Sequence, residues 1–254
     1  MAHHTLKGSY QQLVERLNRF PQGAPPSETL YEILKVLFSE REAGLVALLP
    51  IKPFTAEKAS QIWKTDLVSA RKALDELAGR ALLIDTELPD GQRTYILPPP
   101  MAGFFEFSMM RLRGDINQKA LAELFYQYMN VEEDFIKALF VNGETQLGRV
   151  YVQEAVLSSD NALHVLDYER ASEVIQTATH IGVGVCYCRH KMEHLGRACD
   201  APMDICMTFN TTAASLTRHG AARSIDSAEC LDLLQEAFDG NGNIHGISLH
   251  RILP

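Results

Sequence analysis

Four of the five cysteines of this 254-residue chain lie within twenty-one residues, and this clustering restricts the fold more than any other feature. They are Cys186, Cys188, Cys199 and Cys206, in the spacing C-x-C-x10-C-x6-C, whereas Cys230 stands apart. Thiols gathered so closely either bind a metal centre or pair as disulfides. The segment that carries them must therefore bend so that the sulfur atoms approach one another.

The expected compartment favours a metal centre. The first twenty residues contain no apolar stretch long enough for a signal peptide, and no segment approaches the ~18 uninterrupted apolar residues of a membrane span. We therefore expect a cytoplasmic protein with no membrane association, in which thiols stay reduced. The odd number of cysteines also fits poorly with a complete set of disulfides.

The cysteine spacing distinguishes between kinds of metal centre. A structural zinc site usually takes its thiolates from C-x2-C pairs, which this segment lacks. In an extended backbone, a C-x-C pair directs both side chains to the same face, one repeat apart, which suits ligands of different irons. A [4Fe–4S] cluster takes one thiolate per iron and tolerates irregular spacing. The spacing therefore favours a cluster over zinc, and either of these over unliganded cysteines.

Other residues of the same segment suit a negatively charged cluster. The Arg189 guanidinium could offset its charge, and Gly184 frees the backbone so that amide groups could donate to the sulfur atoms. His194 is a candidate hydrogen-bond donor to the cluster. Cys230 lies among leucines on an apparent helix, so we expect it to be a buried apolar residue and not a ligand.

The first 100 residues predict a domain of helices followed by a hairpin. Ser27, Thr55 and either Thr65 or Asp66 are the predicted N-caps of three helices, with a short apolar element after the first. The Pro-Asp-Gly turn at 89–91, between two β-rich runs, predicts the hairpin. This order resembles a winged helix-turn-helix over about residues 26–100.

The charge of this domain does not favour DNA binding. Residues 64–80, around the third predicted helix, hold four basic and three acidic side chains, and the whole chain has a formal net charge of −8. DNA-binding surfaces are normally basic. Nucleic acid is therefore a possible but not a favoured partner, and a structural or protein-docking role ranks first.

The remainder predicts a helical connector at 101–148 and a mixed α/β domain at 149–254. In the connector, helices are expected at 118–129 and 131–140, and its dense aromatic residues are expected to form a core. In the last domain, strands are expected at 148–157 and 161–167, and glycine-rich residues 180–185 are expected to turn. Its helices are predicted at 168–179, 210–216 and from about 226. The fold class is therefore α+β, mainly helical.

Several segments resemble one known family. The run GVCYCRHKMEHLGRACDAPMDICMTF resembles the signature of an anaerobe family of ferredoxin-type 4Fe–4S binding proteins, and GFFEFSMMRLRGDINQKALAELFYQYMNVEEDF and GRVYVQEAV are also similar to it. The resemblance covers most of the chain and implies that Cys186, Cys188, Cys199 and Cys206 are the cluster ligands. Members of that family often continue into a ferredoxin module with C-x2-C-x2-C-x3-C-P repeats, which this chain lacks.

The sequence therefore predicts a redox protein that holds one [4Fe–4S] cluster, with an electron-transfer or accessory role. We expect it to act with a redox partner protein, and a homo-oligomer is a further option. Two alternatives remain: a winged-helix transcription regulator that senses its cluster, and a structural or interaction protein stabilised by zinc. No nucleotide-binding motif or acid–base constellation is recognisable, so a carrier or accessory subunit is favoured over a stand-alone enzyme.

Overall fold

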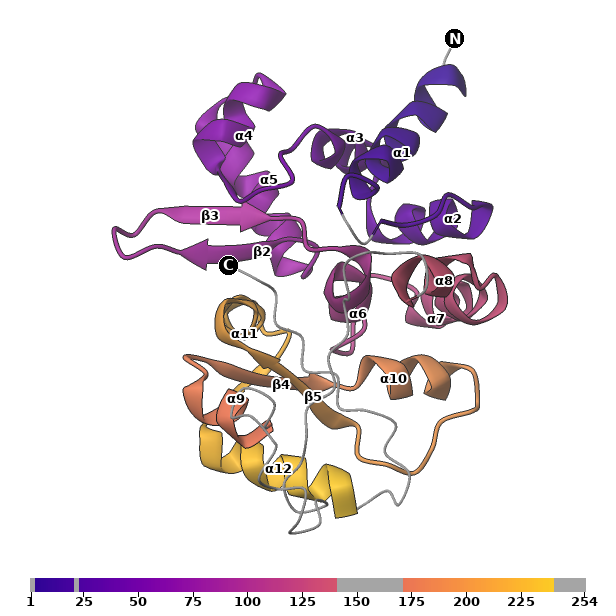
Figure 1. The fold of residues 1–254 in the computed structure, drawn as a ribbon. Helices are drawn as coiled ribbons and strands as arrows, with labels where there is room; N and C mark the ends of the chain where they lie inside the picture. Colours follow the sequence, from indigo (N-terminus) through magenta and orange to yellow (C-terminus); the bar gives the residue numbers. More distant parts are fainter. Residues whose placement is uncertain (1–2, 21–22, 141–170, 240–254) are drawn as a thin grey trace.

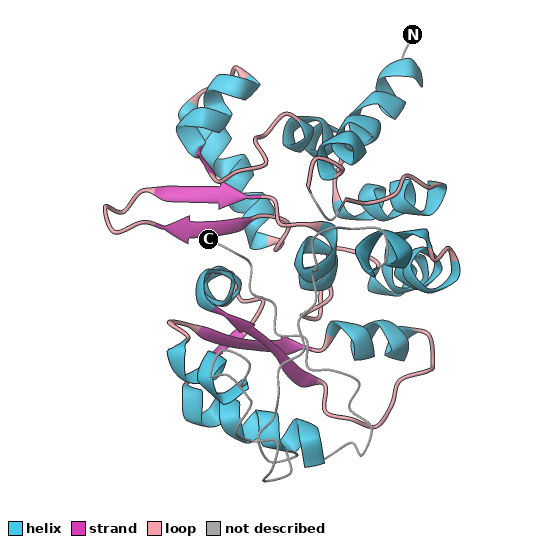
Figure 2. Ribbon diagram, in the orientation of Figure 1, coloured by secondary structure: helices cyan, strands magenta, loops and turns pink. Residues whose placement is uncertain are grey.

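The computed structural model describes residues 3–20, 23–140 and 171–239, and in this part the protein is a mainly helical α+β structure with small antiparallel sheets (Figures 1 and 2). The elements before residue 100 are α1 (His3–Leu17), α2 (Glu28–Leu37), α3 (Glu40–Ala47), β1 (Phe54–Thr55), α4 (Ala56–Trp63), α5 (Leu67–Gly79), β2 (Ile84–Glu87) and β3 (Arg93–Ile96). Those that follow are α6 (Phe105–Phe107), α7 (Gln118–Tyr126), α8 (Asp134–Phe140), α9 (Ala171–Thr177), β4 (Ile181–Val185), α10 (Tyr187–His194), β5 (Asp204–Phe209), α11 (Asn210–Arg218), β6 (Arg223–Ile225) and α12 (Ser227–Asp239). An irregular turn at Pro100–Phe104 precedes α6, and a wide helical turn at Gln127–Val131 continues α7.

The predicted helix starts are confirmed at all three positions. Ser27, Thr55 and Asp66 are the N-caps of α2, α4 and α5, and each side-chain oxygen accepts a hydrogen bond from an amide in the first turn. Such a cap satisfies a backbone donor that would otherwise have no partner in the helix.

Helix α3 was not predicted as a helix. The sequence there indicated only a short apolar element, but Ser39 and Glu42 form a capping box in which each side chain binds the backbone amide of the other. This reciprocal pair starts the helix three residues after α2 ends.

The first sheet joins the hairpin to a short third strand, in the order β1-β3-β2. The predicted hairpin is confirmed as β2 and β3, and Gly91 in its turn adopts a φ of +79°. The winged-helix resemblance rests on the three predicted helices now seen as α2, α4 and α5 and on the hairpin, whereas the unpredicted α3 and the short strand β1 lie between α2 and α4. The resemblance itself remains a prediction.

The aromatic residues after residue 100 form part of a core, as expected. Phe105 is fully buried, with its ring centre 5.0 Å from that of Phe125 and 6.1 Å from that of Phe135. This core extends from α1 to α8 and also includes Tyr187 of α10. The segment around α6 therefore anchors the start of the cysteine-rich segment to the N-terminal helices.

The second sheet has the strand order β5-β4-β6, with α11 packed on one side and α9 and α12 on the other (Figure 1). The expectation of a turn at 180–185 was wrong, because residues 181–185 form the central strand β4. A Cβ atom on Gly182 would lie 3.1 Å from Thr217 Cγ2 and 3.2 Å from Ala222 Cβ. The glycine therefore allows close packing against the strand and does not bend it.

The helices predicted in the last third of the chain correspond to α9, α11 and α12. The strands predicted at 148–157 and 161–167 lie outside the described residues. Among the helices that the structure describes, none is both long and apolar enough to span a bilayer.

A buried carboxylate links the hairpin to α11. Asp85 of β2 is fully buried, and its Oδ1 accepts hydrogen bonds from Ser215 Oγ at 2.6 Å and from His219 Nε2 at 3.1 Å. Its Oδ2 lies 2.8 Å from Arg218 Nη1 and 3.6 Å from Arg93 Nε, in ion pairs without hydrogen-bond geometry. Residues from two distant parts of the chain therefore neutralise one charge.

Candidate metal centre

Three of the four clustered cysteines lie where β4, α10 and β5 meet. Cys186 follows β4 and is the N-cap residue of α10, and Cys188 lies in the first turn of that helix. Cys206 is on β5, opposite Gly184 of β4 in the antiparallel pair. The prediction that Cys186 and Cys188 share an extended backbone was wrong, because a helix begins between them. Sheet pairing is what brings Cys206, eighteen residues further along, to the same place.

Cys186 and Cys188 interact directly. The Cys188 thiol, which can donate a hydrogen bond to the Cys186 sulfur, lowers the pKa of Cys186 and has its own pKa raised in return. The first-turn amides of Cys188 and Arg189 also favour a Cys186 thiolate, although neither makes a capping hydrogen bond. One proton therefore leaves this pair more easily than it leaves an ordinary cysteine.

The Cys206 thiol is enclosed although the residue as a whole is only half-buried. Burial raises its pKa, and the nearby Glu106 and Cys186 raise it further, whereas the Tyr187 amide donates toward the sulfur and lowers it. The sulfur is the atom that would bind a metal, and it lies on the enclosed side of the residue. The three thiols thus form one electrostatically coupled group.

Cys199 does not belong to this group. It is exposed, in the loop between α10 and β5. Its pKa is lowered by the amide of Ala201 and by the Arg189 side chain. Arg189 also donates from Nη1 to the carbonyl oxygen of Pro202 at 2.5 Å. Arg189 therefore connects α10 to the loop that carries the fourth cysteine, and its charge acts on Cys186 as well.

The other two predicted cofactor-binding residues have different surroundings. A Cβ atom on Gly184 would lie 3.0 Å from the Met110 carbonyl oxygen and 3.1 Å from that of Ala221, so this glycine permits close backbone packing. His194 Nε2 lies 3.1 Å from His190 Nε2 and is half-buried. Its role toward a cluster stays a prediction.

Two charged groups next to the thiols were not predicted as site residues. Glu106 of α6 is buried, and burial together with the neighbouring Cys186 raises its pKa to about 7. Lys191 is buried with its Nζ 5.6 Å from the centre of the Tyr187 ring, and it interacts electrostatically with Cys188. A carboxylate inside a run of phenylalanines was the available signal for Glu106, because an ionisable group in a core needs a reason to be there.

Cys230 is fully buried, and its thiol contacts Met207 Sδ at 3.6 Å. Burial raises its pKa to about 12, so it remains a neutral thiol in the core of the second sheet. The prediction that Cys230 is a packed apolar residue is confirmed.

The sulfur atoms are not gathered into a finished ligand set. Within residues 3–20, 23–140 and 171–239, no three histidine, cysteine or acidic side chains converge closely enough to hold one metal ion. The thiol chemistry and the donor amides suit an iron–sulfur cluster, but the loop with Cys199 would have to close over the other three cysteines.

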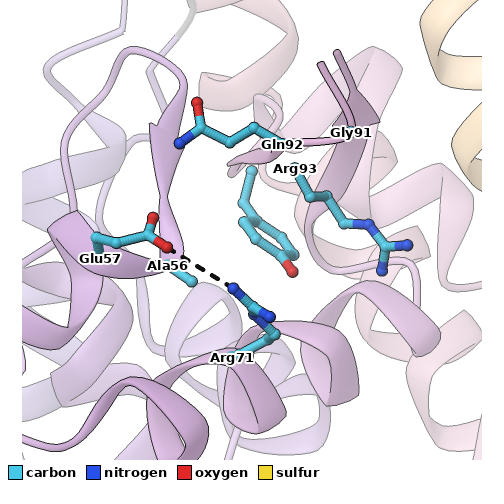
Figure 3. Close-up of a pocket in the computed structure, with 7 residues that line it drawn as sticks. Ala56, Glu57, Arg71, Gly91, Gln92 and Arg93 are labelled. Carbon is cyan, nitrogen blue, oxygen red and sulfur yellow. Dashed lines mark ion pairs between the residues drawn. The ribbon is translucent and has the colours of Figure 1, made fainter. Parts of the chain in front are cut away.

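Helix α5 and the hairpin, which a winged helix would use to bind nucleic acid, carry two arginines that already pair with carboxylates. A small hollow of about 220 Å³ lies between the start of α4, α5 and the hairpin turn (Figure 3). Arg71 Nη2 lies 3.7 Å from Glu57 Oε1, and Arg93 Nη1 lies 3.4 Å from Asp75 Oδ1. Both arginines are thus paired with carboxylates, and DNA as a partner stays an untested prediction.

Comparison with known proteins adds no further assignment. No protein-family model matches the chain, and neither a curated protein nor a solved structure shows significant similarity to it. The resemblance to ferredoxin-type 4Fe–4S proteins therefore stays a prediction from the cysteine motif.

Proposed function

We propose that this protein binds one [4Fe–4S] cluster through Cys186, Cys188, Cys199 and Cys206 and exchanges electrons with a redox partner protein. The observation that carries the proposal is the coupled group of Cys186, Cys188 and Cys206 at the junction of β4, α10 and β5. The three thiols come from segments eighteen residues apart and interact electrostatically beside donor amides, which is an arrangement that a cluster site uses.

The loop between α10 and β5, which carries Cys199, would have to close over the other three cysteines to complete the ligand set. Arg189 holds the Pro202 carbonyl and already interacts with Cys199, so it can guide the fourth thiol toward the other three. Its guanidinium and the Lys191 ammonium also offset the negative charge of thiolates. A bound cluster supplies one-electron transfer, and these residues hold it and influence its potential.

The position of the site suits exchange with a partner. Cys188 and Cys199 are exposed, whereas Glu106 and Tyr187 are buried and Tyr187 belongs to the aromatic core. An electron would therefore enter and leave from the solvent side, where another protein can dock. A cytoplasmic location, where thiols remain reduced, is part of this proposal.

The proposal is tested by anaerobic purification, iron and sulfide analysis, and EPR of the reduced protein. We expect about four irons and four sulfides per chain. Cys199→Ser should lose most of this iron, whereas Cys230→Ser, which changes a core thiol, should keep it. Stoichiometric zinc without sulfide would replace the proposal with the zinc-stabilised structural protein.

The Asp85 link supports a second candidate function. Cys206 lies on β5, which continues directly into α11, and the residues at the end of α11 bind Asp85 of the hairpin. A change at the cysteines could therefore alter the helices and hairpin that resemble a DNA-binding domain. A cluster-sensing regulator would bind DNA with strong salt dependence and lose or gain that binding when the cluster is removed. This regulator ranks second because Arg71 and Lys72 of α5 already pair with glutamates, whereas a DNA-binding helix needs cations for phosphate groups.

A further inference from the structure

We infer that His190 and His194 form a second metal site, separate from the cysteines, which takes a divalent ion of the zinc type. The two histidines lie four residues apart on α10, so they share one face of the helix. Their Nε2 atoms are 3.1 Å apart. The inference does not depend on the proposed iron–sulfur cluster.

The tautomer of His190 suits a ligand. Its Nδ1 lies 2.7 Å from the carbonyl oxygen of Met109, which can only accept, so Nδ1 carries the proton. In the tautomer with its single proton on Nδ1, the ring presents the Nε2 lone pair toward His194 Nε2. Metal-binding histidines commonly donate their other N–H to a backbone carbonyl in this way, which fixes the ring and strengthens the ligand. His190 is almost completely buried, so its orientation is held by packing.

The spacing of the two rings suits a common ion. Two imidazoles bound to one tetrahedral zinc at ~2.1 Å hold their nitrogen atoms about 3.4 Å apart, which is slightly more than the observed separation of 3.1 Å. Rings that faced each other along a straight N–H···N hydrogen bond would have centres roughly 5.4 Å apart. The observed centres are 4.8 Å apart, so the rings are inclined and their Nε2 atoms can point toward a shared position beside the N···N line.

The surroundings are compatible with entry and binding of a cation. His194 is half-buried, so an ion can reach the pair from solvent. Burial and the adjacent His190 lower the pKa of His194, as does Lys119, whereas the exposed Glu193 acts in the opposite direction and favours a cation. The run His-Lys-Met-Glu-His also has the H-x-x-E-H spacing with which one class of zinc enzymes supplies two of its histidine ligands.

The chemistry limits the choice of metal. Imidazole nitrogen suits zinc, copper and nickel and does not suit magnesium or calcium. With two protein ligands among the described residues, water would fill the remaining positions, so affinity is lower than in three- or four-ligand sites.

The test uses zinc with the reduced full-length protein. Two-bond ¹H–¹⁵N spectra of the histidine rings report directly which ring nitrogens bind metal, without any substitution. We expect added zinc to move the Nε2 signals of His190 and His194 together and to leave His180, which is exposed at the start of β4, unchanged. Unmoved His190 and His194 signals at excess zinc would show that the pair is a simple hydrogen bond and would overturn the inference.

Zinc stoichiometry gives an independent check, because the cysteines can also bind zinc. His194→Gln should bind one zinc fewer per chain than the wild type, with roughly a tenfold or greater loss of affinity for that ion. His180→Gln should match the wild type. Equal zinc binding by His194→Gln and wild type would also refute the site, whatever the cysteines bind.

Discussion

Asp85→Asn should destabilise the protein at neutral pH, because Asp85 is the charge on which the hairpin and α11 converge. Burial alone would raise the pKa of Asp85, but hydrogen bonds from His219 and Ser215 and the charge of Arg218 outweigh it and lower the pKa from 3.8 to about 2. A shift of this size corresponds to ~2 kcal/mol of folding free energy. The Asp85 side chain is fully buried, but 29% of the Arg218 side chain is exposed, so solvent screens that ion pair in part.

The pH dependence has a defined sign. A carboxyl group whose pKa is lowered in the folded state stabilises the protein above its unfolded pKa and loses that effect as the pH falls. The contribution of Asp85 should therefore be complete above about pH 5 and should decline between pH 4 and pH 2. The amide side chain of the Asp85→Asn variant does not ionise, so the difference in stability between the two proteins should shrink over the same range.

Urea denaturation of wild type and Asp85→Asn at pH 7 and at lower pH measures this difference. Glu32→Gln is the matched control, because Glu32 pairs with Lys35 on an exposed helix face and should contribute less than ~1 kcal/mol. A loss below ~1 kcal/mol for Asp85→Asn at pH 7, or a loss that stays constant down to pH 3, would refute the reasoning.

Three further outcomes are expected. In the cluster-free protein, iodoacetamide should modify Cys186 at a pH below that of an ordinary thiol, as measured by peptide mass spectrometry, and an ordinary alkylation profile would contradict the coupled thiol pair. Gly184→Ala should cost ~1–3 kcal/mol in urea denaturation, because its Cβ meets two backbone carbonyls, whereas Gly114→Ala, with open space around it, should change stability little. In the iron-loaded protein, Arg189→Gln should release iron to a chelator roughly tenfold faster than wild type, and equal release by Arg189→Gln and the control Arg197→Gln would argue against a role in holding the loop.

Helix starts were predictable because their causes are local. A cap at Ser27, Thr55 or Asp66 involves a side chain and an amide three residues away, so the pattern is visible in a short stretch of sequence. The glycines of β4 were misinterpreted because their neighbours come from distant residues. Nothing near Gly182 in the sequence reveals that Thr217 and Ala222 pack against it.

In the candidate site, too, the residue types could be predicted from the sequence, whereas their arrangement could not. The four clustered cysteines and Arg189 were identified from their spacing, since the chemistry of thiols and cations is a property of residue type. Their arrangement was not, because the C-x-C pair spans the start of a helix and Cys199 lies apart from the other three. Glu106, eighty residues earlier in the chain, could be placed beside the thiols only by the fold.

The sequence by itself determined which side chains carry chemistry and where several helices begin, because these depend on residue type and on neighbours within one helical turn. The tertiary structure alone decided that Cys206 joins Cys186 and Cys188, that the rings of His190 and His194 incline toward each other, and that Asp85 receives partners from α11. These contacts depend on sheet pairing and packing between residues far apart in the chain, which no local pattern specifies.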